Sequence, residues 1–135
     1  MFVTGVATDS DRSAQLRGAL ADALVADGMI LSPEVEAAFR TVPRHLFAPG
    51  ESLDVAYDAY STVVPVRDAE GLLLSVVSAP QVQAIMLEMA GIEPGMRVLE
   101  IGSGGYNAAL IAELTGSGEV TTVDIDPEAM PRSLS

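Results

Sequence analysis

Residues 96–124 read MRVLEIGSGGYNAALIAELTGSGEVTTVD, and this stretch decides the fold. Its short apolar run from Val98 through Leu99 to Ile101 predicts a strand that is buried on both faces. Strong helix formers from 107 to 115 predict a helix, which the glycines at 116 and 118 should end. The β-branched residues of 120–125 predict a second strand. The stretch therefore predicts a β-α-β unit with parallel strands and a right-handed crossover.

The turn between the first strand and the helix carries the chemistry. Gly102, Gly104 and Gly105 leave space for a ligand to approach the backbone, and the helix start offers N–H groups. Asp124, at the end of the second strand, is placed to accept hydrogen bonds from a ribose diol. Glu100 disfavours a pyrophosphate but suits a cationic ligand. S-adenosylmethionine combines such a cation with a ribose and an adenine. The alternative is a glycine-rich turn that binds no ligand.

Two other functions remain open at this point. A nicotinamide-dependent oxidoreductase would fit the glycine turn and an acid about twenty residues further on, here Asp124. However, Asn107 stands where the dinucleotide motif requires its third glycine, and Glu100 is badly placed beside a pyrophosphate. The other alternative is a non-catalytic remnant that binds a partner protein through an uncovered sheet edge. Binding of a nucleoside cofactor distinguishes the remnant from the enzymes.

Composition narrows the class of protein. The chain has 135 residues, with 7 basic against 19 acidic side chains and a net charge of −12, which argues against a nucleic-acid partner. It has no cysteine, so neither disulfides nor thiolate metal sites are available, and we expect no metal. No apolar run reaches the roughly 20 residues of a membrane helix, and no signal peptide is evident. We therefore expect a cytoplasmic protein that binds no membrane.

The N-terminal part predicts a small cap. Residues 1–77 are expected to form a helical cap and a β-hairpin, and residues 78–135 a partial nucleoside-binding domain. Helix-start signals stand at 9–11 and 32–34, and Gly28 and Pro43 end the two helices. We expect Leu46 and Phe47 to anchor the next segment to the core. Two β-rich runs then flank a polar turn and predict the hairpin, over residues 61–66 and 71–77.

Ser78 begins the segment that leads into the next helix. The sequence Ser-Ala-Pro-Gln at 78–81 marks the helix start, and Ser78 either caps the helix or turns its hydroxyl toward a substrate pocket. The residues alone leave both interpretations open. We expect the buried side of this helix to consist of its large apolar residues, Val82, Ile85, Met86 and Met89.

His45 is the only histidine and so invites a role as a general base. Because prolines flank its segment, we favour a surface or hydrogen-bonded structural residue instead. Tyr57 and Tyr60 could line a pocket, but tyrosines in such a segment more often pack with the hydroxyl in water.

Several motifs together resemble one family. They are Val-Pro-Arg-His-Leu-Phe-Ala-Pro at 42–49, Ala-Tyr at 56–57, Ser-Ala-Pro-Gln at 78–81, Met-Leu-Glu at 86–88 and the glycine-rich stretch 95–109. In combination they closely resemble protein-L-isoaspartate O-methyltransferases, from about Ser32 to Pro127. The resemblance implies a class I methyltransferase with a Rossmann-like, doubly wound α/β sheet. It also implies methyl transfer from S-adenosyl-L-methionine to the free carboxylate of isoaspartyl residues in proteins or peptides.

The resemblance also assigns site residues. Ser78 corresponds to the family's active-site serine and is the candidate catalytic residue. The candidate cofactor-binding residues are Glu100, Gly102, Ser103, Gly104, Gly105 and Asp124. No general base is required, because a carboxyl group with a pKa of about 3.5 is already ionised at neutral pH.

The chain departs from the family pattern in two ways. The turn at 102–105 is one residue tighter than acid-x-Gly-x-Gly-x-Gly, which resembles a branch that includes methyltransferases of lanthipeptide-like peptides. Furthermore, only the first two of about seven strands are expected, so the chain resembles a C-terminally truncated member. Two parallel strands cannot bury both faces, so we expect exposed apolar surface and self-association through the sheet edges.

Overall fold

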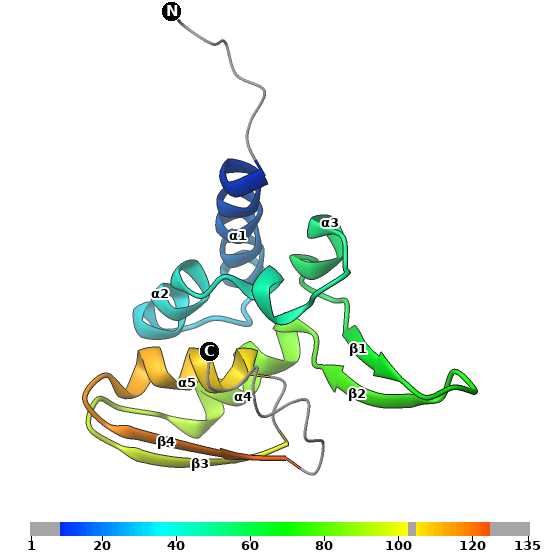
Figure 1. The fold of residues 1–135 in the computed structure, drawn as a ribbon. Coiled ribbons are helices and arrows are strands. Elements are labelled where there is room, and N and C mark those ends of the chain that lie inside the picture. Colours follow the sequence, from blue (N-terminus) through cyan, green and yellow to red (C-terminus); the bar gives the residue numbers. More distant parts are fainter. Residues whose placement is uncertain (1–8, 103–104, 125–135) are drawn as a thin grey trace, which may run out of the picture.

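A computed structural model describes residues 9–102 and 105–124 (Figure 1). Five α-helices, one 3₁₀ helix and four strands are found in these residues. Their order is α1 (Asp9–Ala26), α2 (Pro33–Thr41), the 3₁₀ helix η1 (Arg44–Phe47), α3 (Leu53–Ala56), β1 (Val63–Arg67), β2 (Leu73–Val77), α4 (Pro80–Ala90), β3 (Arg97–Ile101), α5 (Tyr106–Thr115) and β4 (Glu119–Val123).

The β-α-β unit is confirmed. Strands β3 and β4 pair in parallel, from Arg97 opposite Glu119 to Ile101 opposite Val123. Helix α5 connects them and lies over one face of the pair (Figure 1). One further backbone bond, 2.8 Å from the Gly102 N–H to the Val123 carbonyl, extends the pairing into the glycine turn. The turn is therefore held directly against the end of β4.

The expectation that the first strand is buried on both faces is wrong. Leu99 and Ile101 expose 63% and 81% of their surface, whereas Glu100 exposes only 8%. Burial thus alternates along β3, as it does in a strand with one covered face. Both α4 and α5 lie on the same side of the strands in Figure 1, and no described element covers the other side. The exposed apolar surface expected from the sequence is therefore present on this face.

The predicted hairpin is also confirmed. Strands β1 and β2 are antiparallel, with Val63 opposite Val77 and irregular register farther along. They form a sheet of their own, separate from β3 and β4 (Figure 1). The boundary predicted at residue 77 coincides with the end of β2. Division of the chain into domains at this point remains a prediction.

The N-terminal cap packs on the β-α-β unit through α2 and α5. Phe39 of α2 is fully buried, and its ring lies edge-on to that of Tyr106, with centroids 6.2 Å apart. Phe47 also contacts Tyr106, at 5.9 Å, whereas Leu46 is 67% exposed and does not anchor η1 as expected. One continuous core cluster therefore includes residues of α1, α2, η1, α4 and α5.

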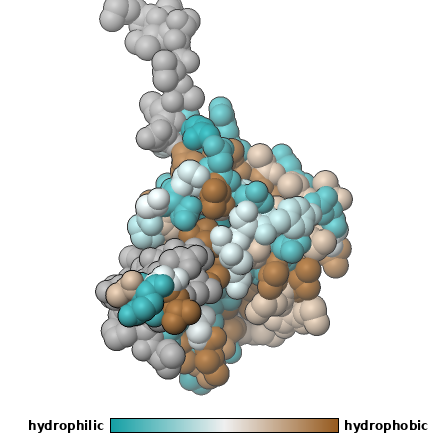
Figure 2. All heavy atoms as spheres, turned by 90° about the vertical axis from the view of Figure 1, so that its right-hand side faces the viewer, coloured by the Kyte–Doolittle hydropathy of each residue, from teal (hydrophilic) through white to brown (hydrophobic). Residues whose placement is uncertain are grey.

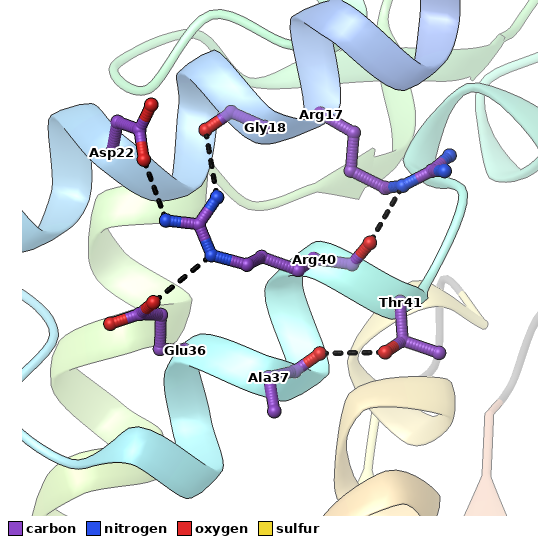
Figure 3. Close-up of polar contacts among 7 residues, drawn as sticks. All are labelled: Arg17, Gly18, Asp22, Glu36, Ala37, Arg40 and Thr41. Atoms are coloured by element: carbon purple, nitrogen blue, oxygen red, sulfur yellow. Dashed lines mark hydrogen bonds and ion pairs between the residues drawn. The ribbon is translucent and has the colours of Figure 1, made fainter.

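Arg40 joins α1 to α2 at the surface (Figure 3). Its guanidinium donates to Asp22 at 2.6 Å, to Glu36 at 3.0 Å and to the Gly18 carbonyl at 3.3 Å. In return, Arg17 Nε donates to the Arg40 carbonyl at 2.8 Å. The hydrogen bonds to Asp22 and then Glu36 raise the pKa of Arg40. Because these groups are well exposed, the network adds little to the free energy of folding. Its main effect is to fix the angle at which α1 and α2 cross.

The buried side of α4 differs from the expectation. Val82, Ile85, Met86 and Met89 expose between 40% and 82% of their surface. The helix instead buries Gln83, Ala84 and Leu87. The positions of the large apolar residues do not reveal this face. Gln83, in the middle of it, is a polar residue that is buried beside another buried side chain. Figure 2 shows brown apolar atoms reaching the surface at several places among the hydrophilic ones.

Glu88 ties α4 to the start of α2, and we expect it to make stability sensitive to acid. One carboxylate oxygen accepts hydrogen bonds from the Leu31 N–H, the Ser32 N–H and the Ser32 hydroxyl at 2.8–2.9 Å. Burial raises the pKa of Glu88, but these bonds outweigh it and the net shift is downward. A lowered folded-state pKa stabilises the fold above the unfolded-state pKa, and this contribution is lost as the pH falls through the folded-state value.

The change Glu88→Gln should therefore lower the free energy of unfolding at pH 7 and flatten its decline between about pH 5 and pH 3. Urea unfolding across that range measures both effects. Glu93→Gln is the matched control, because Glu93 is exposed and its carboxylate makes no hydrogen bond among the described residues. Equal pH slopes in the wild type and Glu88→Gln would contradict the assignment.

Candidate functional site

A cleft of about 220 Å³ lies between the start of α4 and the turn after β3. It is lined by Ser78, Glu100 and Gly102, three of the residues that the sequence assigns to the site. Gln83 and Asn107 complete its polar lining. The fold thus brings the candidate catalytic serine and the candidate cofactor residues to one place, although they lie more than twenty positions apart in the sequence.

Glu100 is a buried carboxylate with a fixed orientation. Asn107 Nδ2 donates to its Oε2 and Thr122 Oγ1 donates to its Oε1, both at 2.7 Å. The side chain comes from β3, and its two donors come from α5 and β4. Among the described residues Glu100 forms no ion pair, so its negative charge is compensated only by neutral donors. A buried carboxylate that has no cationic partner and lies at a cleft is suited to bind a cationic ligand group.

Glycine is required at two positions of the turn. Gly102 and Gly105 have φ angles of +87° and +89°, a region that other residues rarely adopt. Gly105 is also the N-cap of α5. The Gly102 N–H is bonded to Val123, so it is not one of the helix-start donors that the sequence offers to a ligand. Ser103 and Gly104 lie outside the described residues.

Asp124 follows β4 directly and is partly buried. Because Gly102 is bonded to Val123, the glycine turn and Asp124 lie at the same edge of the parallel pair. This is the edge at which open α/β sheets bind ligands. The placement suits the expected contact with a ribose, which remains a prediction.

The structure decides between the two interpretations of Ser78 in part. The N-cap of α4 is Ala79, which makes no side-chain capping bond, so Ser78 is not the cap. Ser78 is exposed, lines the cleft, and accepts a bond from Arg44 at its carbonyl oxygen. Its hydroxyl is therefore left for another role, and the assignment as catalytic residue stays a prediction.

Arg44 is the residue of this region that sequence reasoning missed. It is fully buried and lies behind the cleft, where it contacts both Ser78 and Tyr106. Burial lowers the pKa of its guanidinium, against the opposing effect of Tyr106. The available signal was an arginine within the apolar segment 42–48, which is an unusual place for a buried charge.

His45 is a hydrogen-bonded structural residue, as favoured from the sequence. Its Nδ1 lies 2.7 Å from the Tyr57 hydroxyl, and Tyr57 is buried. Burial, and then the charge of Arg17, lower the pKa of His45. His45 does not line the cleft, and Tyr60 is 55% exposed.

Within 9–102 and 105–124, no group of three histidine, cysteine or acidic residues is placed to hold a metal ion. None of the helices there is long and apolar enough to cross a membrane.

Comparison with known proteins gives one consistent result. The family model described as protein-L-isoaspartate(D-aspartate) O-methyltransferase matches residues 15–133. The protein-L-isoaspartate O-methyltransferase of Hyperthermus butylicus is 36% identical over an alignment of 129 residues, gaps included, that covers 89% of this chain and 51% of that protein. The enzyme of Pyrococcus horikoshii is 42% identical over 106 residues, or 78% of this chain and 44% of its own length. The chain thus spans about half the length of these relatives.

Solved structures agree with the fold. A protein-L-isoaspartate O-methyltransferase superposes with a TM-score of 0.76 at 31% identity, over 87% of this chain and 37% of that one. A Plasmodium falciparum protein, solved in complex with S-adenosyl-L-homocysteine, superposes with a TM-score of 0.68 at 21% identity, over 87% of this chain and 53% of that one. At 21% identity, the likeness to the Plasmodium falciparum protein concerns the fold alone.

Proposed function

Because the chain belongs to the protein-L-isoaspartate(D-aspartate) O-methyltransferase family, we propose that its cleft binds S-adenosyl-L-methionine for methyl transfer to isoaspartyl carboxylates. The observation that carries the proposal is Glu100, a buried carboxylate held by Asn107 and Thr122 at the edge of the glycine turn. Its charge suits the cationic groups of this cofactor. It does not suit the pyrophosphate of NAD, the ligand of the competing oxidoreductase hypothesis.

The residues of the chain have distinct roles in this proposal. Glu100 attracts the cationic part of the cofactor, and Asp124 accepts hydrogen bonds from its ribose. Gly102 and Gly105 present no side chain to a ligand, and Ser103 and Gly104 are the other candidate cofactor-binding residues of this stretch. When bound, the cofactor supplies a methyl group on a positively charged sulfur.

Ser78 is assigned to the methyl acceptor. Its exposed hydroxyl at the cleft can donate a hydrogen bond to the acceptor carboxylate and so orient one oxygen. An isoaspartyl carboxylate is ionised at neutral pH, so no residue of the cleft has to remove a proton. Catalysis then consists of alignment and exclusion of water. A protein or peptide substrate and a cytoplasmic location are part of the same proposal.

The test is calorimetric titration of the purified 135-residue chain with S-adenosylhomocysteine. We expect the wild type to bind it and not to bind NAD. The change Glu100→Gln keeps the shape of the side chain but removes its charge, so it should weaken binding roughly tenfold or more.

Glu119→Gln is the matched control. Glu119 lies in the same sheet at the opposite end of the parallel pair, where it forms an exposed ion pair with Arg97. Its neutralisation should leave the affinity unchanged. A folded wild-type chain that binds neither ligand would refute the proposal and favour the non-catalytic remnant. Where binding is found, methylation of isoaspartyl and ordinary aspartyl peptides then separates protein repair from modification of another peptide.

A further inference from the structure

Arg44 is an unusual core residue. It is completely buried, and among the described residues it forms no ion pair. Burial of a charge without a carboxylate partner is costly, and apolar residues of similar volume generally fill a core at least as well. Filling the core is therefore a poor explanation for an arginine at this position.

The guanidinium contacts three segments that are distant in sequence, at Ala56, at 78–83 and at Tyr106. Its Nε donates to the Ala56 carbonyl at 2.7 Å, and its two terminal nitrogens donate to Gln83 Oε1 at 2.9 Å and to the Ser78 carbonyl at 2.8 Å. Its central carbon lies 4.7 Å from the centroid of the Tyr106 ring. A planar group with several fixed donors can satisfy all these contacts at once, which an ammonium cannot.

Two of these segments form opposite walls of the cleft. Ser78 and Gln83 belong to the wall that leads into α4, and Tyr106 is the first residue of α5, directly after the glycine turn. No backbone hydrogen bond joins residues 76–83 to the described residues 100–102 or 106–107. Arg44 thus contacts the first wall at Ser78 and Gln83, and reaches the second only through Tyr106, the buried neighbour of the cleft-lining Asn107.

We propose that Arg44 is the positioning residue that sets the Ser78 wall relative to the glycine turn. It acts through the Ser78 carbonyl and the Tyr106 ring and does not itself reach the cleft. The inference deepens the proposed function, since it treats this cleft as the ligand site. It predicts that a change at Arg44 alters ligand affinity beyond any effect on stability.

The test compares Arg44→Lys with Leu24→Ala. Lysine keeps the positive charge but cannot make the three hydrogen bonds and stack on Tyr106 together. Leu24 is equally buried in the same core cluster but lies in α1, away from the cleft. We expect Arg44→Lys to weaken S-adenosylhomocysteine binding about tenfold. Leu24→Ala should lower the Tm and leave the affinity of the folded protein within twofold of the wild type.

Tyr106 offers a second matched pair, which remains informative if Arg44→Lys fails to fold. Tyr106→Phe retains the ring contact with Arg44, so it should weaken binding much less than loss of the ring does. Tyr106→Leu removes the ring and should weaken binding. Equal affinity of all the variants, with only the Tm changed, would overturn the inference.

Hydrogen exchange separates this inference from the proposed function, because it requires no ligand. In Arg44→Lys, amides of 78–83 and 105–112 should both exchange faster, while 16–26 keeps its protection; Leu24→Ala should show the reverse pattern. If the wild type does not bind S-adenosylhomocysteine but this pattern is found, the proposed function fails and the positioning role stands. Unchanged exchange in both segments refutes the positioning role.

Discussion

Replacement of Gly118 by alanine should separate the first rung of the parallel sheet. A Cβ at this position would overlap the Met96 carbonyl oxygen and lie 2.9 Å from the Gly95 carbonyl carbon. That same Met96 oxygen accepts the hydrogen bond that starts β4, from the Glu119 N–H at 3.1 Å. Because backbone atoms cannot rotate away as a side chain can, we expect Gly118→Ala to reduce the free energy of unfolding by about 3 kcal/mol or more.

Gly116→Ala is the control for this prediction. Gly116 ends α5 with a φ of +56°, but a Cβ there meets nothing within 4 Å. Alanine at 116 should therefore cost only about 1–3 kcal/mol, the backbone strain of a positive φ combined with a ψ of −105°. Urea unfolding of both variants provides the comparison. If Gly116→Ala lowers the free energy of unfolding more than Gly118→Ala does, the need for glycine in this turn comes from its backbone conformation and not from the close approach at Gly118.

The change Phe39→Ala should remove a large share of the stability of the chain. Phe39 is fully buried between α2 and α5 and packs edge-on against Tyr106. Removal of a buried phenylalanine ring typically costs about 3–5 kcal/mol, and domains of this size are stable by only about 5–15 kcal/mol. We expect the Tm to fall by roughly 10–20 °C in a thermal scan followed by circular dichroism.

Leu31→Ala serves as the comparison for Phe39→Ala. Leu31 is 78% exposed, so its truncation should change the free energy of unfolding by no more than about 0.5 kcal/mol. A similar Tm for the two variants would mean that the cap and the β-α-β unit do not share a core.

The elements that the sequence predicted well are those with strong local signals. Glycines punctuate residues 102–118, and the helix formers between them leave little doubt about α5 and its flanking strands. The hairpin was likewise evident from β-rich runs around a polar turn. The short helix α3 and the 3₁₀ helix η1 were missed, because four-residue helices contain too few residues for a period to be recognised.

Burial was harder to predict than secondary structure. The apolar residues of β3 suggested two buried faces where only one is covered, and those of α4 suggested the wrong face, since which face is covered depends on elements elsewhere in the chain. The same limit applies to the site. Its glycines and acids were visible as a motif, but nothing local connects Arg44 to Gln83 or Ser78. Contacts of a buried polar residue are set by tertiary structure and leave little periodic trace in the sequence.

The contact between Phe39 and Tyr106 also constrains how the chain can fold during its synthesis. The two residues are separated by 67 positions, and at about 5–20 residues per second the ribosome needs roughly 3–13 s to pass from one to the other. Throughout that interval the apolar side of α2 has no α5 to cover it. The newly made cap is therefore a natural client for chaperones until the glycine turn and the helix behind it have emerged.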